Sequence, residues 1–221
     1  MKLEKEINLS QSDAFIIVDI QNDFLPGGTL AVETGYEIIE GVNAVSAIFD
    51  KNRFKIILTQ DWHPSNHKSF ASAHFRKQPF DKYSKEGIGP LLWPDHCIRG
   101  QNGADFSPLL NTAFADLIIR KGSNPNIDSY SAFFENDKKS ETGLSGFLKA
   151  VGITRIFLCG LALDYCVYFS AIDGRNLGFD VYVIVDLTRG INDPAGSISN
   201  ALEDMTKQGV KFLKLNLLLG K

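Results

Sequence analysis

The stretch RIFLCGLALDYC, residues 155–166, decides the fold class of this chain. Its first half is short and apolar throughout, which is typical of a strand that a parallel sheet buries on both faces. A turn then leads to Cys166, in the first turn of a helix that we predict over residues 164–177. Ligands bind at the carboxyl ends of the strands in an open parallel sheet. The pattern therefore predicts that Cys166 lies at a ligand-binding edge.

Two other predicted strands lead to ionisable residues at the same edge. Residues 14–18 lead to Asp19, and residues 116–120 lead to Lys121. An acid, an ammonium group and a thiol that meet at one edge form a nucleophile with its own base and its own cation. The alternative interpretation is a structural ion pair beside a buried helical cysteine. We predict that Asp19, Lys121 and Cys166 catalyse hydrolysis through a covalent cysteine intermediate.

The predicted helix start offers a way to activate the thiol. Asp164 is placed to cap the helix that contains Cys166. The free N–H groups and partial positive charge of a helix N-terminus lower the pKa of a nearby cysteine. The same N–H groups can hold the oxyanion of a tetrahedral intermediate. We therefore expect Cys166 to have a lowered pKa.

Strand-like and helix-like segments alternate along the whole chain. The predicted strands cover residues 14–18, 55–58, 116–120, 155–159, 180–185 and 210–215, and the predicted helices cover residues 38–49, 142–151, 164–177 and 194–208. Thr34 and Glu37 match a capping box before the first helix. Apolar strands separated by helices predict an α/β fold with three α/β/α layers around a six-stranded, mostly parallel, doubly wound sheet.

Composition limits the classes of partner. The chain has 221 residues, of which 44% are hydrophobic, so we predict a single domain over residues 1–221. A net charge of −3 gives no basic surface for nucleic acid or anionic lipid. No apolar run approaches the roughly 20 residues that span a membrane, and the first residues lack a secretory signal. Three cysteines form no disulfide framework, so we expect a cytoplasmic protein.

A long irregular stretch, at about residues 62–107, is predicted as an insertion that binds metal and substrate. It contains all four histidines and is rich in aromatic residues, which argues against disorder. Asp61 and His63 stand at i and i+2, on one side of an extended segment, and His96 could complete the site. One acid and two histidines suit zinc, iron or manganese. We expect His67 and His74 at the surface, with His67 as a reserve ligand.

Five motifs in this order resemble the nicotinamidase (pyrazinamidase) family of the isochorismatase-like cysteine hydrolases. They are VDIQNDF (18–24), TQDWHP (59–64), WPDHC (93–97), KG (121–122) and GLALDYCV (160–167). The resemblance implies that Cys166 is the nucleophile, Asp19 the general base and later acid, and Lys121 the cation beside both. It also implies an isochorismatase-like fold and hydrolysis of nicotinamide to nicotinate and ammonia, a step of NAD salvage, through a thioester.

The resemblance implies further residues around the substrate. Asp61, His63 and His96 would bind one divalent metal ion, with zinc preferred and iron or manganese as alternatives. A cis peptide at Leu161–Ala162 would aim the Ala162 N–H, beside that of Cys166, at the oxyanion. The remaining implied residues would surround the pyridine ring: Phe24 and Trp93 on its two faces, with Tyr130 and Tyr165 as further walls.

Several points stay open at this stage. Some relatives have a fourth ligand where this chain has Ser69, so we expect three protein ligands plus water. Pyrazinamide is a further candidate substrate, and assembly into a homo-oligomer is an alternative to a monomer. Another small amide or a ureido acid is the main alternative substrate. A redox-sensing module is the alternative outside enzymes, but no second cysteine stands at C-x-x-C spacing.

Overall fold

The computed structural model describes residues 1–85 and 87–220 of the chain. Six parallel strands form one sheet in the order β3-β2-β1-β4-β5-β6. Their bounds are β1 Asp13–Val18, β2 Lys55–Asp61, β3 Leu117–Lys121, β4 Arg155–Leu161, β5 Asp180–Arg189 and β6 Lys211–Leu213. The predicted α/β fold with a doubly wound sheet is confirmed, and the sheet is parallel throughout these six strands.

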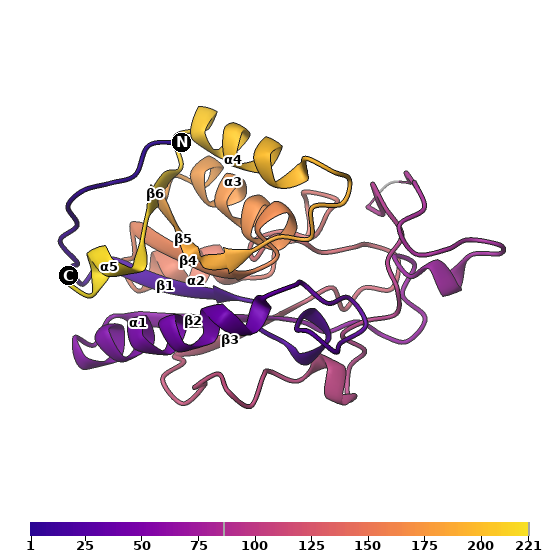
Figure 1. The fold of residues 1–221 in the computed structure, drawn as a ribbon, viewed down its shortest axis with the longest axis horizontal. Coiled ribbons are helices and arrows are strands. Elements are labelled where there is room, and N and C mark those ends of the chain that lie inside the picture. Colours follow the sequence, from indigo (N-terminus) through magenta and orange to yellow (C-terminus); the bar gives the residue numbers. More distant parts are fainter. Residues whose placement is uncertain (86, 221) are drawn as a thin grey trace.

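Helices cover both faces of the sheet. Figure 1 shows α1 (Ile39–Lys51) on one side and α3 (Tyr168–Asn176) with α4 (Ser197–Lys207) on the other. The shorter helices are α2 (Leu144–Ala150), which leads from β3 to β4, and α5 (Leu215–Leu218) after β6. None of the helices among the described residues is long and apolar enough to cross a membrane.

The strand order reverses between β1 and β4, at the centre of the sheet. All six residues of β1 are buried, as are the last six of β4, and both strands are apolar apart from a charged first residue, Asp13 or Arg155. Asp19 follows β1 and Cys166 follows β4. Both residues therefore stand at the switch point, where ligands bind in sheets of this kind.

The first helix confirms one sequence prediction and corrects another. Val42, Val45 and Phe49 are buried as their spacing predicts. The predicted capping box is wrong, because Thr34 has a left-handed backbone and caps nothing with its side chain. Instead Arg189 Nε donates to Thr34 Oγ1 at 3.1 Å, and the Arg189 guanidinium pairs with Glu37 at 3.1 Å. A 3-10 turn, Gly35–Ile38, then leads into α1.

Three strands extend at least two residues further than predicted toward the carboxyl edge of the sheet. β2 reaches Asp61, β4 reaches Leu161 and β5 reaches Arg189, whereas β6 has only three residues. Polar residues hid the extensions of β2 and β5, and Gly160 hid that of β4, because these residues break the apolar pattern while the backbone continues to pair. Asp61 lies opposite Lys121 in the β2–β3 register. Two ionisable residues thus become direct neighbours on adjacent strands.

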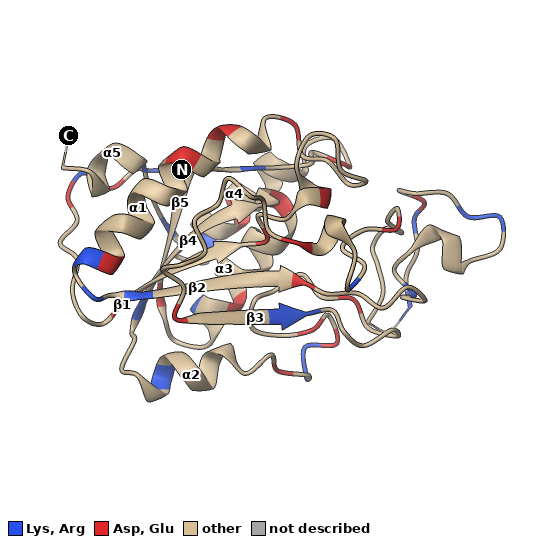
Figure 2. Ribbon diagram, turned by 90° about the horizontal axis from the view of Figure 1, so that it is seen from below, with Lys and Arg blue, Asp and Glu red and all other residues tan. Residues whose placement is uncertain are grey.

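The segment over residues 62–107 contains no α-helix and no strand of the sheet among its described residues. It has two 3-10 turns, Ala71–Ala73 and Asn102–Ala104, and isolated bridges such as His63 with Ile98 and Phe70 with Trp93. Figure 2 shows the arrows of β2 and β3 pointing toward this side of the molecule. That the segment is an insertion into a single domain stays a prediction.

Candidate active site

Three strand ends bring Asp19, Lys121 and Cys166 together, and all three side chains are buried. The Lys121 ammonium lies 3.0 Å from Asp19 Oδ2 and 3.5 Å from Cys166 Sγ. A carboxylate oxygen of Asp19 and the sulfur of Cys166 lie within 4.8 Å of each other. Thiol, carboxylate and ammonium thus form one buried cluster, while the assigned roles stay predictions.

Lys121 is the centre of this cluster. Its ammonium also pairs with Asp61 at 2.5 Å and donates to the backbone oxygen of Ser129 at 2.9 Å. Burial by itself would lower the pKa of Lys121, but the charges of Asp19 and Asp61 hold that pKa well above its usual range. Lys121 is therefore a permanent cation that joins the thiol, the acid and the first residue of the predicted metal site.

Asp19 has the properties of a base that also holds a proton. Burial raises the pKa of Asp19, although the charge of Lys121 acts in the opposite direction. Thr59 Oγ1 donates a hydrogen bond of 2.6 Å to Asp19 Oδ1, which also favours the carboxylate. A carboxyl group with a raised pKa can accept the thiol proton and return it to a leaving group.

The expected lowering of the Cys166 pKa is wrong. Burial raises the pKa of the Cys166 thiol well above its usual range, and Asp19 and Asp61 raise it further against the opposing charge of Lys121. A helix terminus cannot outweigh complete burial beside two carboxylates. Cys166 is thus a protonated thiol at rest, and a base must remove its proton before it attacks.

The turn after β4 also differs from the predicted cap. Residues Leu163–Val167 form a wide π-helical turn, which begins from Ala162. Asp164 does not cap it; its carboxylate accepts from Ile191 N at 2.9 Å and Asn192 N at 2.8 Å. Asp164 therefore ties this turn to the segment before α4. Local sequence could not show these partners, because they lie about 27 residues away along the chain.

The peptide bond Leu161–Ala162 is cis, as the resemblance implied. Gly160 precedes it with a positive φ of 106°, and a Cβ at Gly160 would lie 2.0 Å from the backbone oxygen of Val18. Only glycine allows β1 and β4 to approach so closely at this point. Ala162 and Cys166 both line the adjacent pocket. Their role as oxyanion donors stays a prediction.

The pocket beside Cys166 has an aromatic lining. Phe24, Trp93, Tyr130 and Tyr165, the four predicted ring contacts, all line it. The rings of Trp93 and Tyr165 meet edge to face at 4.9 Å, and Trp93 Nε1 donates to Tyr130 Oη at 3.0 Å. An apolar pocket with a few polar groups is typical of a site for a flat aromatic ligand. Sequence reasoning missed two of its apolar residues, Leu30 and Ile191.

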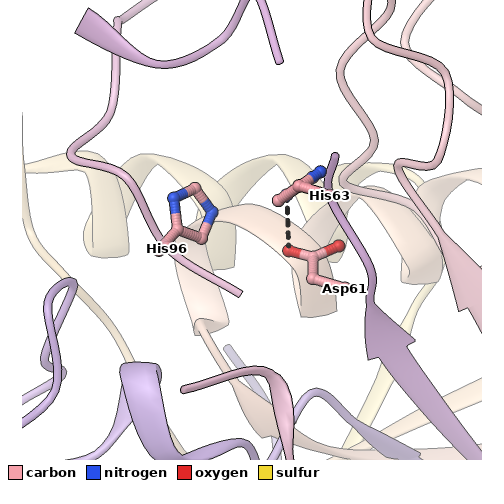
Figure 3. A group of neighbouring side chains, drawn as sticks. All are labelled: Asp61, His63 and His96. Carbon is pink, nitrogen blue, oxygen red and sulfur yellow. Dashed lines mark ion pairs between the residues drawn. The ribbon is translucent and has the colours of Figure 1, made fainter. Parts of the chain in front are cut away.

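Asp61, His63 and His96 form the candidate metal site (Figure 3). One potential ligand atom from each lies within 4.8 Å of the other two. Nδ1 of His63 donates to the Gly122 oxygen at 2.8 Å, and Nδ1 of His96 donates to the Pro94 oxygen at 2.8 Å. These bonds leave Nε2 of each ring available, and the buried His63 Nε2 has no hydrogen-bond partner in the part of the chain that the structure describes. The donor set therefore fits a divalent transition metal.

The electrostatics of this site favour positive charge. Burial would lower the pKa of His63, but the charge of Asp61 raises it above its usual range. Burial lowers the pKa of His96 to about 4, with a contribution from the neighbouring His63, so His96 is neutral. Neutral imidazole is the form that binds metal ions. The Lys121 ammonium pairs with both Asp19 and Asp61. A cation held by these residues would therefore balance the negative charge of Asp61.

Asp128 is a pocket residue that the sequence analysis missed. It is buried, it lines the same pocket as His96, and its Oδ2 has no hydrogen-bond partner among the described residues. Burial raises its pKa, although His63 acts in the opposite direction. The residue lies in irregular backbone, where no periodicity marks it. The only sequence signal for Asp128 as a site residue was that it is the single charged residue in the polar stretch before Tyr130.

The prediction that His67 lies at the surface is wrong. His67 is fully buried, and its ring packs 4.4 Å from the ring of His63. Its Nε2 donates to the Ile127 oxygen at 3.1 Å, and its Nδ1 is 2.7 Å from Ser69 Oγ. Both ring nitrogens are thus engaged, and burial lowers the pKa of His67 to about 3. His67 supports His63, while His74 is partly exposed as expected.

Comparisons with known proteins agree with this geometry. The family model described as the isochorismatase domain matches residues 13–216. A nicotinamidase of Acinetobacter baylyi is 45% identical over 209 residues, which cover 95% of this chain and 95% of that protein. This chain is therefore similar to a nicotinamidase along nearly its whole length.

Two solved structures are similar to this chain. PnC1 from L. infantum, in complex with nicotinate, is 38% identical, with a TM-score of 0.83 and coverage of 96% of this chain and 98% of that chain. The pyrazinamidase of Pyrococcus horikoshii, in complex with zinc, is 34% identical, with a TM-score of 0.75 and coverage of 92% and 99%. One relative thus binds a pyridine carboxylate and the other binds zinc.

Proposed function

This chain belongs to the nicotinamidases of the isochorismatase family, and from this premise we propose that it hydrolyses nicotinamide to nicotinate and ammonia. The observation that carries the proposal is the ammonium of Lys121, which contacts Asp19, Asp61 and Cys166 at once. Through this contact a nucleophile with its base lies directly beside a set of metal ligands. A ring that is held on the metal side would present its carboxamide to the thiol.

The first half of the reaction forms a thioester. Asp19 takes the proton of the Cys166 thiol, and the sulfur bonds to the carboxamide carbon while the C=O electron pair moves to the oxygen. The N–H groups of Ala162 and Cys166 stabilise this oxyanion, and one such donor is typically worth about 3 kcal/mol. The oxyanion then collapses, the C–N bond breaks, and Asp19 returns its proton to the departing ammonia.

The second half of the reaction regenerates the thiol. Asp19 takes a proton from a water molecule as the water oxygen bonds to the thioester carbon. The C–S bond then breaks, the sulfur recovers the proton from Asp19, and the nicotinic acid loses its remaining proton to solvent as it leaves as nicotinate. The Lys121 ammonium lies next to both groups throughout, and so it offsets the negative charge that passes between Asp19 and Cys166.

Asp61, His63 and His96 would hold one divalent metal ion, and we propose zinc because the Pyrococcus horikoshii relative is a zinc complex. Such an ion, when bound, is a Lewis acid for the ring nitrogen and withdraws electron density from the carboxamide. Phe24 and Trp93, with Tyr130 and Tyr165, enclose the ring and exclude water from it. The chain's own residues thus orient the substrate before the thiol attacks.

The decisive experiment measures ammonia release from nicotinamide, with metal analysis of the same sample. We expect turnover of nicotinamide and of pyrazinamide, together with about one equivalent of metal. Aliphatic amides and a ureido acid serve as comparison substrates. Turnover of the ureido acid without turnover of nicotinamide would move the enzyme to another branch of the same family.

The three cysteines bear on where this enzyme works. Cys97, Cys159 and Cys166 are all free and buried. A nucleophilic cysteine must remain reduced, and the cytoplasm maintains free thiols. We therefore propose a cytoplasmic location, while assembly into a homo-oligomer stays a prediction.

A further inference from the structure

We propose that Gln21 and Asp23 are positioning residues that hold the two metal-ligand segments at a set place relative to Asp19. Both residues belong to the motif VDIQNDF, in which the proposed mechanism uses only Asp19 and Phe24. The inference deepens the proposed function and rests on it, because it concerns the same metal site. It assigns the intervening residues a role in metal binding rather than in the chemical step.

Gln21 compensates for a missing strand. The β1–β2 pairing ends at Ile17 with Leu58, and β1 then leaves the sheet at Asp19, which has a positive φ of 48°. β2 nevertheless continues to Asp61, whose other side pairs with Lys121 of β3. On the β1 side, therefore, the last residue of β2 has no strand to support it.

The side chain of Gln21 takes the place of that strand. Its Oε1 accepts from Asp61 N at 2.8 Å, and its Nε2 donates to Asp61 O at 2.9 Å. The same nitrogen donates to Ala104 O at 2.8 Å, and the side chain is fully buried. A primary amide matches the alternating acceptor and donor of a neighbouring strand. Gln21 thus binds both the backbone N–H and the backbone C=O of Asp61, the first metal ligand.

Asp23 holds the other segment. Its Oδ2 accepts from Cys97 N at 2.7 Å, directly after the ligand His96, and its Oδ1 accepts from Thr29 N at 3.3 Å. Cys97 has a left-handed backbone, with a φ of 46°. The hydrogen bond to its N–H fixes the orientation of the peptide that joins it to His96. A Cβ at Gly103 would lie 2.0 Å from Asp23 Oδ2, so the loop closes tightly over this carboxylate.

These contacts link three groups that are distant in sequence. Residues 19–23 connect Asp19 to the backbone of Asp61 through Gln21 and to the backbone after His96 through Asp23. Groups that orient metal ligands typically change metal affinity about 10- to 100-fold when they are removed. Loss of Gln21 or Asp23 should therefore weaken metal binding and raise the KM for nicotinamide more than it lowers kcat.

The test compares Gln21→Met with Gln60→Met in a zinc titration against a competing chelator, without substrate. Gln60 is a matched control because it is also buried and its Nε2 donates to the same Ala104 oxygen at 2.9 Å. Its Oε1 accepts from Arg120, however, and its side chain makes no hydrogen bond to the Asp61 backbone. We expect zinc affinity to fall at least about 10-fold in Gln21→Met and to change less than about two-fold in Gln60→Met.

A second pair keeps the test decisive if Gln21→Met does not fold. Asp23→Ala should lower zinc affinity, whereas Asn22→Ala, which loses the bonds from Asn22 Nδ2 to Asn102 O and Oδ1, should not. Equal zinc affinities within either folded pair would overturn the inference, as would a wild-type protein that binds no divalent metal. A wild-type protein that binds zinc but does not hydrolyse nicotinamide would instead refute only the proposed function.

Discussion

The turn that carries Cys166 and the loop that carries His96 are stabilised in different ways. The turn follows a central strand directly, and the backbone bond from Val167 N to Ala162 O closes it within a few residues, while Asp164 ties it to Ile191 and Asn192. The loop over residues 62–107 has short-range backbone bonds as well, but its described residues include no strand of the sheet. Its ligand segment is held by a side chain from elsewhere, through the 2.7 Å bond between Asp23 and Cys97 N.

Because of this difference, the reacting groups and the metal ligands depend on different parts of the structure for their positions. The reacting groups sit at strand ends, where main-chain geometry determines their positions, so their function is lost chiefly when the reacting atoms are removed. Among the metal ligands Asp61 also ends a strand, but Gln21 holds its backbone, and His63 and His96 lie in the loop. Remote substitutions that keep every ligand should therefore still weaken metal binding. The predictions below test this division, beginning with the largest effect.

Cys166→Ala should abolish turnover and leave the loop intact. The variant removes the nucleophile, for which losses of about 10⁴-fold or more in kcat are typical. Ammonia release measures this loss, while zinc affinity and the thermal melting temperature should stay close to wild type. A variant that retains more than a small fraction of the wild-type rate would show that no covalent route operates.

Lys121→Met should destabilise both regions, because this residue joins them. It leaves Asp19 and Asp61 buried without their ammonium partner, and breaking a buried pair typically costs about 3–5 kcal/mol. Lys55→Met is the matched control, since Lys55 pairs with Asp116 at the partly exposed opposite end of β2 and β3, where a pair contributes about 0–1 kcal/mol. Urea unfolding measures both variants, and equal losses of stability would contradict the central role of Lys121.

Gly122→Ala should damage the metal site while sparing the thiol. A Cβ at Gly122 would lie 2.3 Å from Cε1 of His63, so the ring must move, and zinc affinity should fall about 10-fold or more. Gly100→Ala is the control, because Gly100 has a similar positive φ and nothing within 4 Å of the added Cβ. The control has only the backbone penalty, about 1–2 kcal/mol.

Two measurements together judge the Gly122→Ala variant. A chelator competition gives its zinc affinity, and the rate of alkylation by iodoacetamide reports on Cys166. If the alkylation rate falls as much as the zinc affinity, the two regions are not separable, and the comparison above fails.

Thr59→Val should have the smallest effect, seen in the pH profile. The hydroxyl of Thr59 donates to Asp19 and lowers its pKa against the larger effect of burial. Without this bond the pKa of Asp19 rises further. Because Asp19 must be deprotonated to act as base, the acid limb of kcat/KM should move to higher pH. Thr188→Val, whose hydroxyl donates to Gly160 O instead, should leave that limb in place.

The same group links pH to stability. The pKa of Asp19 is higher in the folded protein than in the unfolded chain, so the folded state binds more protons between those two values. Its contribution to stability is therefore lost as pH rises through the folded pKa. If the acid limb of kcat/KM has no matching change in the free energy of unfolding, a group other than Asp19 controls the pH dependence of activity.

Much of the fold could be predicted because its signals are local. Apolar strands, helical spacing at Val42, Val45 and Phe49, and the order of elements all depend on residues a few positions apart. The ends of β2, β4 and β5 could not be predicted, because polar residues in β2 and β5 and a glycine in β4 continue to pair with a neighbouring strand. The capping box was wrongly predicted for a similar reason, because Arg189 from β5 binds the side chains of both Thr34 and Glu37.

By itself the sequence determined the α/β class, the six strands and the placement of Asp19, Lys121 and Cys166 at strand ends, because backbone pattern and local spacing specify these. Only the tertiary structure decided that Lys121 joins the thiol to the metal side, that His67 supports His63, that Asp128 lines the pocket and that Gln21 replaces a strand. Only it showed that the Cys166 pKa is raised. The physical reason is that burial and hydrogen-bond partners come from segments far apart in the chain, which no short stretch of sequence contains.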